Sequence, residues 1–121
     1  YAFKSLIDAG AMVSFGSDWF VAPLKPLLGI YAATTRRTAD GKNPDGWIPN
    51  EKISVEQAVK AYTINNAYAG NQENDLGTIE VGKLADIVVI SDDIFEISPK
   101  EIINSKVVMT MIGGQVLFQS E

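Results

Sequence analysis

The sequence of 121 residues contains no cysteine and no histidine. Without cysteine, the chain cannot form disulfides, thiolate zinc sites or a cysteine nucleophile. Without histidine, it lacks the usual general base at neutral pH and the commonest nitrogen ligand of zinc. The chain by itself therefore cannot build a Ser-His-Asp triad or a histidine-based metal site.

Positive charge and long apolar runs are also scarce. The 10 Lys and Arg residues are outnumbered by 15 Asp and Glu residues, which gives a formal net charge of -5. Binding of nucleic acid needs a basic face, and spanning a bilayer needs roughly 20 consecutive apolar residues. We therefore expect neither nucleic acid nor membrane as a partner. The length is sufficient for one modest hydrophobic core.

The most informative stretch is residues 11–18. A largely apolar run over 11–15 lies between Gly10 and Gly16, and this pattern predicts a strand buried on both faces. Asp18 follows at once. In α/β barrels, the residue just beyond the carboxyl end of a strand points into the mouth of the active site. From the local sequence alone, a carboxylate that caps the following turn is the simpler interpretation of Asp18. Trp19 fits either a pocket wall or a core position.

Helical periodicity accounts for most of the remaining first half. It predicts helices over residues 1–9, 24–38 and 55–69. The last begins with the capping-box pattern Ser54 to Gln57. Asn65 and Asn66 near its end suggest a polar site, but solvated cap residues are the simpler interpretation. Residues 39–50 are rich in Gly, Pro, Asn and Asp and predict a loop, which is either a substrate-facing rim or a plain connector.

The second half has the pattern of a small sheet. β-Branched and apolar residues predict strands over 85–90, 107–112 and 115–119. Gly113 and Gly114 between the last two are typical of a primed hairpin turn. The composition changes near residues 71–76, so we expect one unit over 1–70 and another over 71–121.

Four motifs in this order carry a resemblance to a known family. They lie at residues 15–19 (FGSDW), 26–36 (PLLGIYAATTR), 53–65 (ISVEQA and AYTIN) and 76–90 (LGTIEVGKLADIVVI). Together they resemble the metal-dependent amidohydrolase superfamily, and within it the amidohydrolase-3 (YtcJ-like) group, which includes N-substituted formamide deformylases. The last motif is the most diagnostic, because it resembles the G-x-I-x-x-G-K-x-A-D signature that begins the C-terminal β-domain of the family.

The resemblance implies an α+β fragment of a larger fold. Residues 1–70 would hold the end of helix 7, strand 8, helix 8 and the following helix of a (β/α)₈ barrel. Residues 71–121 would be the C-terminal strands of a composite β-sandwich. The histidine-bearing strands of the family have no counterpart in this sequence. We therefore expect a C-terminal fragment.

The resemblance also implies a function for the intact protein. It would be a metal-dependent hydrolase of carbon–nitrogen bonds other than peptide bonds, acting on small amide or formamide substrates. Asp18 would be the strand-8 catalytic aspartate and a contact of a divalent metal, with zinc the expected ion, and Trp19 would line the substrate pocket. We expect the isolated chain to be inactive, to bind no metal and to self-associate through the unpaired edges of segment 11–17. The alternative is a stand-alone, non-catalytic α+β interaction module.

Overall fold

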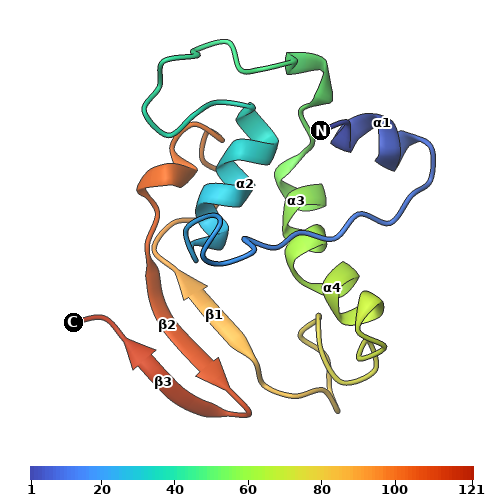
Figure 1. Ribbon diagram of the computed structural model, residues 1–121. Coiled ribbons are helices and arrows are strands. Elements are labelled where there is room, and N and C mark those ends of the chain that lie inside the picture. The colour runs from blue at the N-terminus through green and yellow to red at the C-terminus, as the bar shows by residue number, and fades with distance from the viewer.

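The structure is a computed structural model that describes all residues, 1–121. Four α-helices precede a small sheet, and two short 3₁₀ helices lie in the connections (Figure 1). The elements are α1 (Phe3–Asp8), α2 (Pro26–Thr35), η1 (Pro49–Glu51), α3 (Val55–Tyr62), α4 (Ile64–Ala69), β1 (Ile87–Ile90), η2 (Ile102–Asn104), β2 (Val107–Ile112) and β3 (Gln115–Gln119). None of the helices has the length and apolar character that crossing a membrane requires.

Helix α2 supplies the centre of the hydrophobic core. Pro26 occupies its first turn, and the helix ends at Arg36, whose φ of 60° and ψ of 21° are left-handed. The helix is therefore shorter than the predicted span 24–38. Its residues Ile30 and Tyr31 pack in one cluster with Ile94 and Ile102 from the connection between β1 and β2. Helices and sheet thus share a core. The division into units 1–70 and 71–121 stays a prediction.

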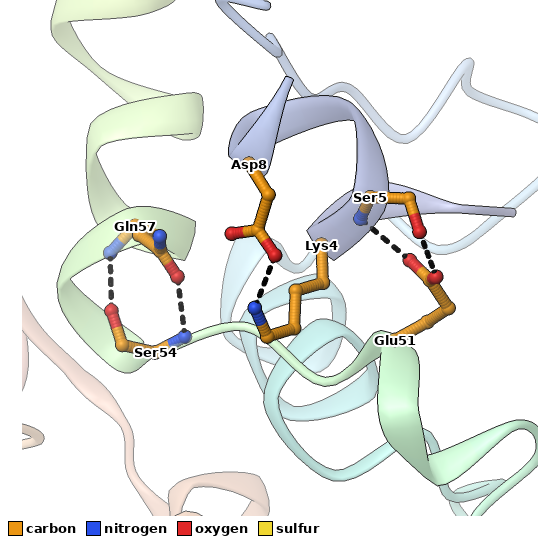
Figure 2. A network of polar contacts seen from close by, with 6 residues as sticks. All are labelled: Lys4, Ser5, Asp8, Glu51, Ser54 and Gln57. Atoms are coloured by element: carbon orange, nitrogen blue, oxygen red, sulfur yellow. Dashed lines mark hydrogen bonds and ion pairs between the residues drawn. The ribbon is translucent and has the colours of Figure 1, made fainter. Parts of the chain in front are cut away.

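Two helices, α3 and α4, occupy the range 55–69 for which the sequence predicts one helix. The prediction of a continuous helix is wrong at Thr63. The start is as expected, because Ser54 and Gln57 form both hydrogen bonds of a capping box (Figure 2). At Thr63, φ is -122° and ψ is -97°, which interrupts the helix. The Thr63 hydroxyl donates to the carbonyl oxygen of Val59, a local bond that competes with the helical pattern. The helix resumes as α4 at Ile64.

The three strands form an antiparallel sheet in the order β1-β2-β3 (Figure 1). Gly113 and Gly114 have φ of 56° and 82°, the two positive values that a type I′ hairpin needs. The hairpin prediction is therefore confirmed. Asp86 reinforces it, since its Oδ1 accepts a hydrogen bond from the Gly113 N–H at 2.7 Å.

Segment 11–17 does not form the predicted buried strand. It is assigned neither helix nor strand, and Val13 and Phe15 are half-buried, whereas Met12, Ser14 and Gly16 are exposed. The prediction is wrong for this chain because a doubly buried strand needs paired strands and covering helices on both sides. Within residues 1–121 the backbone of residues 12–16 has hydrogen-bond partners on one side only, as described below.

Helix α1 docks at the N-terminal end of this segment. The hydroxyl and backbone N–H of Ser5 both donate to the Glu51 carboxylate in η1, and Lys4 pairs with Asp8 along α1 (Figure 2). Donation from the Ser5 hydroxyl, and then from its N–H, lowers the pKa of Glu51. This contact joins the start of the chain to the loop that follows α2.

Candidate functional site

A groove of about 850 Å³ lies between segment 14–18, α2 and the loop after α2. Its lining is mostly apolar and includes the aromatic side chains of Phe3, Phe15, Trp47 and Tyr62. Apolar walls with a few polar groups are the usual composition of a small-molecule site. Asp18 is the one carboxylate among the residues that line the groove.

Asp18 is exposed and lies directly after segment 11–17. Its φ of 49° is left-handed, a conformation that Asp adopts more readily than most residues. Its backbone carbonyl accepts a hydrogen bond from the Val21 N–H at 2.7 Å, which closes a turn. The carboxylate itself makes no hydrogen bond within the chain, so it does not serve as the cap of the following turn. It is available to a molecule in the groove.

Trp19, the other predicted site residue, directly follows Asp18 in the chain but does not line the groove with it. Its side chain is 63% exposed, and it is not among the residues that line the groove. It is not a core residue either. Its role in a substrate pocket stays a prediction.

The backbone of segment 11–17 is held on one side by α3 and α4. The Phe15 N–H donates to the Ala61 carbonyl at 2.9 Å. The side-chain amides of Asn65 and Asn66 donate to the carbonyls of Val13 and Phe15, both at 2.8 Å. Asn66 is exposed, as expected, but both side chains bond to another segment, so the interpretation of these residues as caps is wrong. We call Asn65 and Asn66 the asparagine clamp.

The break at Thr63 makes this arrangement possible. In an uninterrupted helix, the Ala61 carbonyl would accept a hydrogen bond from the N–H four residues later. Because α3 ends at Tyr62, this buried carbonyl is free and accepts from Phe15 instead. In the sequence, the only indication of this contact is the pair of adjacent asparagines, and the pair does not show which segment it would contact.

The ring of Phe15 fixes the segment from a second direction. It lies 4.8 Å from the ring centroid of Phe3 and 5.5 Å from that of Tyr62, in tilted and edge-on arrangements. Burial raises the pKa of the Tyr62 phenol. Phe15 is therefore anchored by its N–H, its C=O and its ring, three residues before Asp18.

Arg36 organises the part of the groove wall that α2 and the loop after it provide. Its Nε donates to the Trp47 carbonyl at 3.0 Å, and the Trp47 N–H donates to the Arg36 carbonyl at 2.7 Å. Its Cζ lies 5.3 Å from the ring centroids of both Phe3 and Trp47. Arg36 is only 8% exposed. These contacts join α1, α2 and the loop into one wall.

The signature at residues 76–90 has a structural role. The Lys83 ammonium donates to the Glu73 carbonyl at 2.7 Å and to the Thr78 hydroxyl at 2.6 Å. Asp86 secures the hairpin, as described above. Both residues lie away from the groove, and their contacts hold turns in place.

The donor set of residues 1–121 does not fit a metal centre by itself. No three His, Cys, Asp or Glu side chains lie close enough together to hold an ion. A catalytic zinc site uses three protein ligands, and Asp18 can supply only one.

Comparison with known proteins identifies relatives over nearly the whole chain. Protein LONG AFTER FAR-RED 3 of Arabidopsis thaliana is 37% identical over 118 residues, which are 98% of this chain and 20% of that protein. YtcJ of Bacillus subtilis is 34% identical over 98% of this chain and 22% of its own length. N-substituted formamide deformylase of Arthrobacter pascens is 29% identical over 96% of this chain and 21% of its own length. The chain thus spans about a fifth of the length of these curated relatives.

The fold is also similar to part of a solved structure. The crystal structure of an amidohydrolase from Thermotoga maritima superposes with a TM-score of 0.73 at 24% identity. The match covers 98% of this chain and 26% of that one. The small α+β fold therefore corresponds to a part of an amidohydrolase structure. The model of the amidohydrolase family matches residues 1–118, and the chain belongs to that family.

Proposed function

We propose that this chain is the C-terminal part of a hydrolase that cleaves carbon–nitrogen bonds other than peptide bonds. Family membership supports hydrolysis, and the similarity to N-substituted formamide deformylase supports a small amide or formamide as substrate. In this proposal, segment 11–17 pairs as the last strand of a (β/α)₈ barrel once the rest of the protein supplies its neighbours, and α2 is the helix that follows it. Strands β1 to β3 belong to a composite β-sandwich that other parts of the protein complete.

The observation on which the proposal depends is the position of Asp18. Asp18 lines a largely apolar groove, its carboxylate has no hydrogen bond within the chain, and it follows a segment anchored on α3 and α4. In α/β barrels, the residue in this place reaches the substrate. We assign Asp18 the role of catalytic aspartate.

The chemistry of that role is the transfer of one proton. The Asp18 carboxylate accepts a proton from the attacking water as the oxygen bonds to the carbonyl carbon. It then donates the proton to the leaving nitrogen as the carbon–nitrogen bond breaks, so that an acid and an amine are released. A divalent metal, with zinc the expected ion, would be held by ligands outside residues 1–121, with Asp18 as the contribution of this chain. The chain alone is therefore expected to be inactive.

The alternative of a stand-alone interaction module is less consistent with segment 11–17. The backbone N–H and C=O groups of Met12, Ser14 and Gly16 make no hydrogen bond within the chain. In a self-sufficient module, these backbone groups would have hydrogen-bond partners, because an unpaired strand edge promotes association with other chains. In a part of a barrel, they are left unpaired where the neighbouring strand is missing.

Product analysis of the full-length protein tests the reaction class. The protein is incubated with N-butylformamide, N-butylacetamide and the dipeptide glycylglycine, and released amine and acid are quantified. We expect equimolar butylamine and carboxylate from at least one butylamide and no cleavage of the dipeptide. Absence of butylamine from both amides, or cleavage of the dipeptide at a comparable rate, would contradict the proposal.

A further inference from the structure

We infer that Asn65 and Asn66 are positioning residues for the catalytic aspartate. The inference rests on the proposed function of Asp18 and concerns how the chain holds that side chain in place. The observations that carry it are two amide-to-carbonyl hydrogen bonds, each 2.8 Å long, between residues more than 50 positions apart in the sequence.

The geometry of the clamp resembles strand pairing made by side chains. In an extended segment, the C=O groups of residues two apart lie on the same side, together with the N–H of the second. Here the Val13 C=O, the Phe15 C=O and the Phe15 N–H all meet partners on α3 and α4. The clamp and the Ala61 carbonyl thus take the place of a neighbouring strand on this side.

The clamp depends on the amide donors. A carbonyl oxygen can only accept, so the group that faces it must be the NH₂ of the asparagine. An aspartate of almost the same shape would present an oxygen that cannot donate and a charge that repels the carbonyl. Asn→Asp is therefore a nearly isosteric change that removes the function of the clamp.

The position of Asp18 follows from this anchor. Only Gly16 and Ser17 separate Phe15 from Asp18, a reach of at most roughly 10 Å. The Asp18 carboxylate has no hydrogen-bond partner of its own, so the backbone on either side decides where it lies. A shift of about 1 Å in a reacting group can lower the rate about 100-fold. Release of Phe15 should therefore lower the rate constant for chemistry rather than substrate affinity.

The test compares kcat and KM of four variants of the full-length protein. Asn65→Asp and Asn66→Asp remove the donors, Asn66→Gln keeps a donor on a longer side chain, and Asn71→Asp is the matched control. Asn71 is exposed and its side chain has no hydrogen bond, so its replacement introduces the same charge without touching the segment. Activity is measured well below each variant's unfolding temperature. Hydrogen exchange of the peptide covering residues 11–18 is followed in parallel.

We expect Asn65→Asp and Asn66→Asp to lower kcat about 10- to 100-fold with KM changed less than about twofold. Asn66→Gln should retain more kcat than Asn66→Asp, and Asn71→Asp should behave as wild type. Exchange of residues 11–18 should accelerate in the Asp variants. If an Asp variant does not fold, Asn66→Gln is compared with wild type to test the inference. We then expect Asn66→Gln to have a lower kcat and faster hydrogen exchange of residues 11–18.

Failure of this inference is distinguishable from failure of the proposed function. If Asp18→Asn is inactive while the Asn variants keep wild-type kcat, the clamp has no positioning role. If the Asn variants lose only thermal stability, their role is structural and the inference is likewise overturned. If Asp18→Asn keeps its activity, the proposed function fails and the inference fails with it.

Discussion

Two glycines of the loop between α4 and β1 provide a controlled test of how that loop is held. Gly77 has φ of +91° and Gly82 has φ of +96°, so both backbones are left-handed to nearly the same degree. A Cβ atom on Gly77 would lie 2.7 Å from the Ile64 Cα and 2.9 Å from the Ala67 Cβ. A Cβ atom on Gly82 would meet nothing within 4 Å. The two substitutions to alanine therefore differ mainly in one steric contact.

The expected magnitudes follow from these distances. The left-handed backbone alone costs an alanine about 1–2 kcal/mol, and this cost applies to both positions. The contact with the α4 backbone adds the cost of overpacking, about 1–3 kcal/mol, at Gly77 only. We expect Gly82→Ala to lower the free energy of unfolding by about 1–2 kcal/mol and Gly77→Ala by about 2–5 kcal/mol.

The assay is equilibrium unfolding of the 121-residue chain in urea, followed by circular dichroism. With a slope of roughly 1–2 kcal/mol per molar for a chain of this size, the extra cost of about 1–3 kcal/mol should place the midpoint of Gly77→Ala about 0.5–3 M below that of Gly82→Ala. Equal midpoints for the two variants would refute the reasoning. They would mean that the loop does not press against Ile64, the residue next to the asparagine clamp.

Three further predictions concern the Lys83 ammonium, the Glu51 carboxylate and the surface of the isolated chain. Lys83→Met should lower the free energy of unfolding by about 2–4 kcal/mol, because the Glu73 carbonyl and the Thr78 hydroxyl lose a charged donor. The exposed Lys100→Met serves as the control, and a loss below about 0.5 kcal/mol in Lys83→Met would contradict this role. The pKa of Glu51 lies below its ordinary value of 4.5, so its bond to Ser5 stabilises the fold above that pH and is lost as pH falls through the lowered pKa. The stability difference between wild type and Glu51→Gln should therefore shrink below pH 4.5, and a constant difference would count against the contact. The isolated chain exposes Leu117 to 63% and leaves the edge of segment 11–17 open, so sedimentation should show self-association that rises with concentration; a monomer at all concentrations would oppose it.

Features that are decided within a few residues could be predicted from the sequence. The capping box at Ser54 and Gln57 is one, since both of its hydrogen bonds lie within a single turn. The hairpin at Gly113 and Gly114 is another, because only residues that tolerate positive φ at both positions make that turn. The family could likewise be named, because four motifs occur in the expected order.

Features that depend on distant contacts could not be predicted in the same way. The apolar pattern of residues 11–15 indicates burial on two faces, but the chain covers this segment only in part and leaves Met12 and Ser14 exposed. The interruption at Thr63 falls in a stretch without Gly or Pro, so no helix-breaking residue in the sequence indicates it. Asn65 and Asn66 contact carbonyls more than 50 residues earlier, and no local pattern encodes that distance.

The carboxylate at position 18 is the point at which the whole account can be tested most directly. The measurement is kcat of the full-length Asp18→Asn protein on its best amide substrate, beside Asp75→Asn, whose exposed side chain makes no hydrogen bond and does not line the groove. Loss of a general acid–base group costs about 10²- to 10⁴-fold. We predict a loss in this range for Asp18→Asn and a kcat close to wild type for Asp75→Asn. A kcat for Asp18→Asn within about twofold of wild type would contradict the assignment of the catalytic aspartate.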